Sequence, residues 1–177
     1  THGIVHHVLP RMSKFSRRLP GSIPDEQVVA ANIDTVFIVC GLDNNYNPAR
    51  VERYLTLAWD SGALPVVILN KADLREDIET CIEEMKNTAL GVGIHALSAS
   101  NHNGLEALDP YFAKGKTIAL LGSSGVGKSS LINCFLDGKK QEVNSVREHD
   151  SHGRHTTTSR ELFLLPNGAL MMDTPGL

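Results

Sequence analysis

The sequence is poor in cysteine and in aromatic side chains. Of its 177 residues, 3 are cysteines, and Phe, Trp and Tyr together make up 5%. The cysteines are scattered, with no CxxC or Cys/His pattern, which indicates buried free thiols in a reducing compartment. No apolar run approaches the ~20 residues of a membrane span, and nothing resembles a signal peptide. We therefore expect a cytoplasmic protein with no membrane partner.

Acidic side chains are missing from the first 20 positions. This segment holds Arg11, Lys14, Arg17 and Arg18 but none of the 20 Asp and Glu residues of the chain. A basic arm on an acidic body fits nucleic-acid contact, and it fits a solvated connector equally well. Residues 1–33 also lack a hydrophobic period and contain several Pro and Gly breaks, so they predict a linker or the end of a preceding domain.

Beyond residue 33, short apolar runs alternate with helical patterns. Strands are predicted at 35–40, 66–69, 94–97 and 117–121, and helices at 48–61, 77–90, 104–113 and 128–136. A β-hairpin is predicted around the turn Pro166-Asn167-Gly168, with strands at 162–165 and 169–172. The alternation predicts an α/β domain with a doubly wound, mostly parallel sheet. The polar, aperiodic residues 137–160 predict a mobile loop.

The segment after the run at 117–121 matches G-x-x-x-x-G-K-[ST], a phosphate loop. The expected phosphate-binding residues are Gly122, Ser123, Ser124, Gly125, Val126, Gly127, Lys128, Ser129 and Ser130. Glycines let backbone N–H groups converge on phosphate oxygens, and the N-terminus of the following helix adds positive potential. Lys128 would reach the β- and γ-phosphates, and the Ser129 hydroxyl would bind Mg²⁺. A glycine turn with a surface lysine is the alternative, and the strand–loop–helix setting opposes it.

A DxxG pattern, Asp173-Thr174-Pro175-Gly176, follows the predicted hairpin. A carboxylate at the carboxyl end of a strand can hold Mg²⁺, directly or through water, so we expect Asp173 in the metal site. The Gly176 N–H is expected to sense the γ-phosphate. By itself the pattern is also that of an ordinary turn, and its position after the phosphate loop favours the nucleotide role.

Asn70-Lys71-Ala72-Asp73 comes directly after a predicted buried strand and matches NKxD. The Asp73 carboxylate can accept two hydrogen bonds from guanine, and adenine offers no such donor pair. The Lys71 stem can cover the base plane, and Asn70 can tie this loop to the phosphate loop. Backbone N–H groups of Ser98, Ala99 and Ser100 would complete the base pocket.

These motifs together resemble the Ras-like translational GTPases, but the base-recognition motif precedes the phosphate loop, as in the circularly permuted GTPases. Four further segments point to one family among the permuted GTPases: KFSR (14–17), EQVVAANID (26–34), ERYL (52–55) and GRHTTT (153–158). They make the chain similar to the ribosome small subunit-dependent GTPases of the RsgA (YjeQ) family. The resemblance implies a permuted Ras-like P-loop domain over 34–177 with a mostly parallel six-stranded sheet. The hairpin would form one edge, and the 117–121 strand would be central.

The resemblance also implies flanking parts. Family members carry an N-terminal OB-fold and a C-terminal zinc domain with Cys and His ligands. Residues 1–33 of this chain resemble the last part of that OB-fold. We expect switch II and that zinc domain, with its structural Zn²⁺, to lie outside these 177 residues.

For function, the resemblance implies a GTPase that acts in late maturation of the small ribosomal subunit, binds its rRNA and is activated by the subunit. We expect a monomer that converts GTP to GDP. Leu177 stands where Ras-type enzymes carry a water-positioning glutamine, so the resemblance points to His155 for that role. Thr157, or its neighbours Thr156 and Thr158, would bind Mg²⁺, and Arg154 would contact either phosphate or rRNA.

Two other functions fit parts of the pattern. One is a GTP-dependent binding switch with negligible turnover, in which Leu177 in place of the usual glutamine marks lost catalysis. The other is an ATPase or small-molecule kinase on the same phosphate loop, which the NKAD motif opposes.

Overall fold

The computed structural model describes residues 4–18, 26–136 and 161–174. The loop predicted at 137–160 therefore lies outside the described residues, as does Gly176. In chain order the elements are β1 (Lys14–Arg18), β2 (Glu26–Ala31), β3 (Thr35–Gly41), α1 (Pro48–Ser61), β4 (Leu64–Asn70), η1 (Ala72–Leu74), α2 (Ile78–Thr88), β5 (Gly93–Ala96), η2 (Leu105–Tyr111), β6 (Thr117–Leu121), α3 (Lys128–Phe135), β7 (Glu161–Leu164) and β8 (Leu170–Asp173).

Six strands form the main sheet in the order β5-β4-β3-β6-β8-β7. All neighbours pair in parallel except β7 and β8, which form the antiparallel hairpin at one edge. The predicted fold class is thus confirmed, including the hairpin at the edge and β6 near the centre. This order brings the carboxyl ends of β3, β4, β6 and β8 together along one border of the sheet, perpendicular to the strands. Parallel α/β folds bind ligands at this border.

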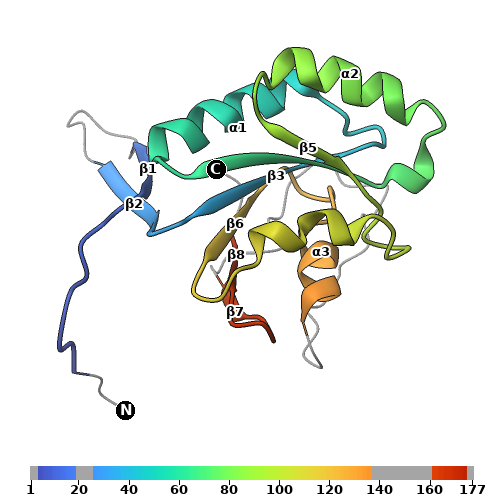
Figure 1. The fold of residues 1–177 in the computed structure, drawn as a ribbon. Coiled ribbons are helices and arrows are strands. Elements are labelled where there is room, and N and C mark those ends of the chain that lie inside the picture. Colours follow the sequence, from blue (N-terminus) through green and yellow to red (C-terminus); the bar gives the residue numbers. More distant parts are fainter. Residues whose placement is uncertain (1–3, 19–25, 137–160, 175–177) are drawn as a thin grey trace.

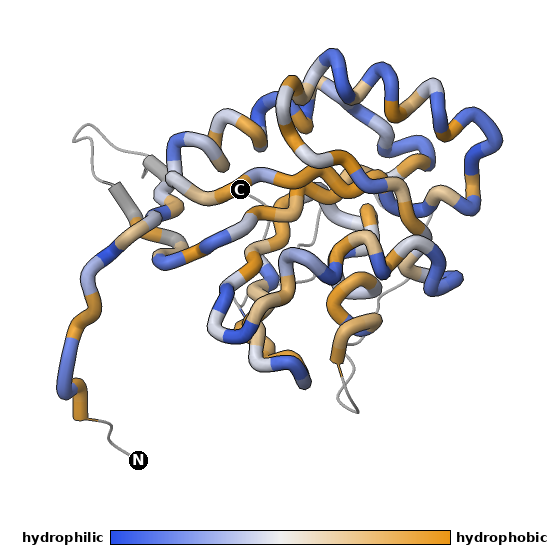
Figure 2. The backbone as a smooth tube through the Cα atoms, in the orientation of Figure 1, coloured by the Kyte–Doolittle hydropathy of each residue, from blue (hydrophilic) through white to orange (hydrophobic). Residues whose placement is uncertain are grey.

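The sheet is buried on both faces. In β3, Val36 and Ile38 join the core under α1 and α2, whereas Phe37 and Val39 join the core with α3 and η2. Figure 1 shows α1 and α2 on one side of the sheet and α3 on the other. The strands between these helices are strongly hydrophobic in Figure 2. Because successive side chains of a strand point to opposite faces, a continuous apolar run fills both cores.

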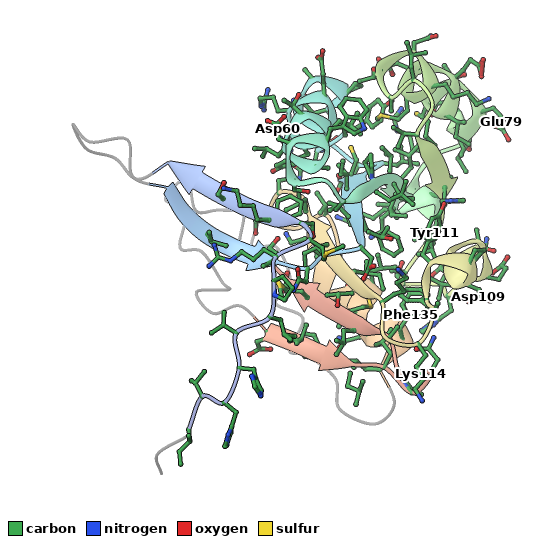
Figure 3. The ribbon with its side chains drawn as sticks, turned by 60° about the vertical axis from the view of Figure 1, so that its left-hand side comes forward. Asp60, Glu79, Asp109, Tyr111, Lys114 and Phe135 are labelled. Atoms are coloured by element: carbon green, nitrogen blue, oxygen red, sulfur yellow. The ribbon has the colours of Figure 1, made fainter. Side chains whose placement is uncertain are left out.

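Helix α1 is fixed at both ends by local chemistry. The Asn47 side chain accepts a hydrogen bond from the Arg50 N–H at 2.9 Å, and Pro48 occupies the first turn. Gly62 ends the helix with φ 81°, a left-handed conformation that glycine adopts without strain. Asp60 and Glu79 point outward from α1 and α2 (Figure 3). No helix in the described ranges has the length and apolar character needed to span a bilayer.

A separate antiparallel pair, β1 with β2, precedes the main sheet. The sequence predicts no strand there, because proline and glycine interrupt the segment and the runs are short. Phe15 and Ala30 are 4% and 7% exposed and belong to the core under α1. Part of the segment interpreted as a linker or domain tail therefore packs against the main body, while residues 4–12 extend away from it (Figure 1).

Candidate nucleotide-binding site

The phosphate loop runs between β6 and α3, as the motif predicted. Gly122 and Gly127 have φ of 157° and 97°. A Cβ on Gly122 would lie 2.5 Å from the Val39 carbonyl oxygen, and one on Gly127 would lie 2.2 Å from Asn70 Nδ2. Only glycine fits either position, because both the backbone conformation and the close neighbours exclude a side chain. The loop is thereby held as a tight turn at the N-terminus of α3.

Lys128 begins α3 and folds back over the loop. Its Nζ donates hydrogen bonds to the carbonyl oxygens of Gly122 at 2.7 Å and Ser123 at 3.1 Å. Burial lowers the pKa of Lys128, and the charge of Asp173 opposes that shift. The ammonium group is thus held inside the turn, where the backbone N–H groups of the helix N-terminus also add positive potential.

Asp173 lies beside the phosphate loop, as expected from its place at the end of β8. It is 1% exposed, and in the β6–β8 ladder it pairs with Leu120, two residues before Gly122. The next residue, Thr174, is also buried, and its Oγ1 donates to the Leu120 carbonyl oxygen at 2.5 Å. These contacts fix the start of the DxxG segment against β6.

The base-recognition motif follows β4 at the same edge of the sheet. Asn70 is 2% exposed and connects two loops. Its Nδ2 donates to the Val126 carbonyl oxygen at 2.8 Å, and its Oδ1 accepts from the Ala99 N–H at 3.0 Å. The predicted tie between this motif and the phosphate loop is therefore present, and the segment containing Ala99 is joined to it as well.

Lys71 and Asp73 differ in their surroundings. Lys71 has a left-handed φ of 65°, and its Nζ donates to the Gly125 carbonyl oxygen at 2.6 Å. Its aliphatic stem therefore runs toward the phosphate loop. Asp73 lies in the one-turn helix η1 and is exposed, so its carboxylate is open to a ligand. The two side chains have the exposure that covering and reading a base require.

The Ser98-Ala99-Ser100 segment is a closed turn. Ser98 pairs with Asn103 through backbone hydrogen bonds of 2.9 and 3.1 Å, and the Ser98 and Ser100 hydroxyls lie 3.0 Å apart. Cys134 of α3 donates from Sγ to the Ala99 carbonyl oxygen at 3.2 Å. The turn is thus fixed both to Asn70 and to the helix that follows the phosphate loop.

Two residues outside the predicted motifs, Asp43 and Arg50, reach the same loops. Asp43 Oδ2 accepts from Lys71 Nζ at 2.5 Å. Arg50 Nη1 donates to Ser123 Oγ at 2.9 Å. The signal that could have identified them is position, because the polar run after β3 leaves the sheet at the same edge as the phosphate loop.

The residues present fit a phosphate-bound Mg²⁺. The metal prefers oxygen ligands and takes few from protein, and the Ser129 hydroxyl and the Asp173 carboxylate are such groups. Among the described residues, no three His, Cys, Asp or Glu side chains gather as a metal site, so these oxygens would need phosphate or water to complete the coordination. His155 and Thr157 fall outside the described residues.

Comparison with known proteins gives consistent matches. A family model described as RsgA GTPase matches residues 8–177. The small ribosomal subunit biogenesis GTPase RsgA of Methanosarcina acetivorans is 47% identical over 174 residues, which are 98% of this chain and 47% of that protein. Its counterpart in Opitutus terrae is 49% identical over 175 residues, or 99% and 48%. The chain thus spans about half the length of the curated relatives it matches.

Solved structures agree in fold. YjeQ from Thermotoga maritima matches with a TM-score of 0.71 and 29% identity over 97% of this chain and 54% of that one. YloQ, a circularly permuted GTPase, matches with a TM-score of 0.56 and 21% identity over 97% and 58%. The second likeness supports the permuted fold alone.

Proposed function

We propose that this chain, which belongs to the RsgA GTPase family, binds GTP and hydrolyses it to GDP and phosphate. The observation that carries the proposal is the position of Asn70, which joins the base-recognition loop to the phosphate loop through its bond to Val126. A purine nucleotide must contact both loops at once, and this bond fixes the distance between them. Guanine is the base that an exposed carboxylate at Asp73 would select, since adenine lacks the two donors.

Within this proposal the phosphates lie on residues 122–130, with Lys128 beside the β- and γ-phosphates. Ser129 and Asp173 hold Mg²⁺, together with Thr157 or one of its threonine neighbours. When bound there, Mg²⁺ would supply positive charge that stabilises the phosphate oxygens. The Gly176 N–H contacts the γ-phosphate. The burial of Asp173 beside the loop supports this assignment.

The attacking water is proposed to be positioned by His155. Leu177 occupies the place of the usual glutamine, and an apolar side chain cannot orient water. An imidazole can do so near neutral pH. In the full-length protein, His155→Ala should keep GTP binding while losing most hydrolysis, whereas His152→Ala should keep both. Equal loss in the two variants would remove the special role of His155.

The biological role proposed is late maturation of the small ribosomal subunit, with hydrolysis activated by that subunit and its rRNA. Relatives that are about half identical carry the name small ribosomal subunit biogenesis GTPase, and the basic segment around Arg11 and Lys14 suits a phosphate backbone. We further propose that the protein is cytoplasmic and monomeric.

The test is single-turnover hydrolysis of GTP by the full-length protein, alone and with purified small or large subunits. We expect slow hydrolysis alone and strong stimulation by small subunits only. Lys128→Ala is the binding-defective control. Binding of GTP without stimulated turnover would favour the switch hypothesis, and tight competition by ATP would favour the kinase hypothesis.

A further inference from the structure

Two charged side chains that follow β3 in the chain, Asp43 and Arg50, contact the phosphate loop and the base-recognition loop. Asp43 lies two residues after the end of β3, and Arg50 lies in the first turn of α1. Neither belongs to the motifs that the proposed function uses. They come from one segment of 8 residues, positions 43–50, and they reach two different loops.

A backbone hydrogen bond orients the Asp43 carboxylate toward Lys71. Its Oδ1 accepts the N–H of Asn45 at 3.0 Å, which leaves Oδ2 directed at Lys71 Nζ. Both side chains of the pair are 24% exposed. Burial acts against the carboxylate charge, but Lys71 and the Asn45 N–H outweigh it and hold the pKa of Asp43 below its usual value. The ion pair is therefore present at neutral pH.

Lys71 transmits this contact to the phosphate loop. The same Nζ that meets Asp43 also donates to the Gly125 carbonyl oxygen at 2.6 Å. With both acceptors in place, the ammonium group is held between the Asp43 carboxylate and the Gly125 carbonyl oxygen. Without Asp43, a partly buried charge keeps only a neutral acceptor, and the stem gains freedom.

Arg50 holds the other end of the phosphate loop. The Asn47 cap fixes the first turn of α1, and from there the Arg50 guanidinium donates to Ser123 Oγ. Ser123 is the residue after Gly122, and its carbonyl oxygen accepts from Lys128. Arg53, one turn further along, instead donates to Ala49 of its own helix and is exposed.

We propose that Asp43 and Arg50 form a clamp that positions the phosphate loop and Lys71, and thereby sets the rate at which bound nucleotide dissociates. The inference rests on the proposed GTP binding. Both are positioning residues, since each acts through a residue of the phosphate or base-recognition loop. Loss of either contact should let its loop sample open positions, which raises the dissociation rate more than it changes the association rate.

The experiment measures dissociation of a fluorescent GDP from the full-length protein by stopped flow. Asp43→Asn and Arg50→Ala should each speed dissociation about ten- to a hundredfold, the range for one hydrogen bond to a charged group. Asp60→Asn and Arg53→Ala are the matched controls, because Asp60 points outward from α1 (Figure 3) and Arg53 contacts its own helix. Both controls should match the wild type.

Double mutants separate positioning from general destabilisation. If Arg50 acts through Ser123, Arg50→Ala should add little to Ser123→Ala, and likewise Asp43→Asn should add little to Lys71→Met. Additive effects in both pairs, or wild-type dissociation rates in the single variants, would overturn the clamp. If Arg50→Ala does not fold, Arg50→Lys and Ser123→Ala provide the same comparison. A wild type that binds no GDP would instead refute the proposed function.

Discussion

The side-chain amide of Asn70 donates a hydrogen bond of 2.8 Å to the carbonyl oxygen of Val126, 56 residues later in the chain. The same side chain accepts the Ala99 N–H, so one buried amide connects three loops. Asn can do this because its carboxamide is both donor and acceptor.

Replacing Asn70 by Asp should weaken GDP binding more than it weakens the fold. The carboxylate keeps the acceptor for Ala99 but loses the donor, and it places a negative charge against the Val126 carbonyl oxygen. We expect a loss of about 1–3 kcal/mol in binding free energy. Equilibrium titration with fluorescent GDP measures it, and Asn101→Asp, at an exposed position, is the control. Unchanged affinity in the Asn70 variant would show that the bond does not set loop spacing.

Gly127→Ala should be far more damaging than a comparable glycine replacement elsewhere. Gly127 combines φ 97° with a Cβ position 2.2 Å from Asn70 Nδ2, whereas Gly62 has φ 81° and open space around its Cβ position. Both variants carry the left-handed backbone cost of about 1–2 kcal/mol. Only Gly127→Ala must also displace Asn70. Thermal unfolding and GDP titration of both variants should differ accordingly, and equal losses would contradict the close approach.

Asp73→Asn should exchange guanine preference for xanthine. The amide offers a donor where the carboxylate offered an acceptor, and xanthine presents a carbonyl where guanine presents an amine. We expect GDP affinity to fall by roughly tenfold or more, with xanthosine diphosphate bound better than GDP. Competition titrations of the two nucleotides decide it. Glu76→Gln, three residues further along and also exposed, should keep the wild-type order of preference.

Asp34 should contribute stability that disappears in acid. Burial raises its pKa, but hydrogen bonds from Lys116 Nζ at 2.7 Å and from the Thr117 N–H at 2.9 Å lower it below the usual 3.8. The contribution is therefore complete above pH 3.8 and is lost as pH falls through the lowered pKa.

We expect Asp34→Asn to lower the free energy of unfolding by about 1 kcal/mol at pH 7, a modest value because the pair with Lys116 is partly exposed. Urea unfolding at pH 7 and near pH 3 tests this, with Asp60→Asn as the control. A difference between wild type and variant that is as large near pH 3 as at pH 7 would contradict the assignment.

Much of the fold and of the site could be predicted because the signals are local. The run Val36–Val39 is apolar at every position, which predicts a strand buried on both faces wherever it lies. Gly122, Gly127 and Lys128 are spaced as a phosphate turn requires, and Pro48 with Gly62 marks both ends of α1. The strands β1 and β2 were missed because their pairing, and not their sequence period, makes them strands.

The sequence by itself therefore determined the strands of the main sheet, the permuted order of motifs and the residue types proposed to meet phosphate and guanine, since each depends on neighbours along the chain. The tertiary structure alone decided which polar side chains meet across these loops. Arg50 reaches Ser123, 73 positions later, and Asp43 reaches Lys71, 28 positions later. These pairs exist because β3 lies between β4 and β6 in the sheet, so that polar segments leaving all three strands meet at one edge. Strand order is set by the packing of the whole core, and no local pattern of residues encodes it.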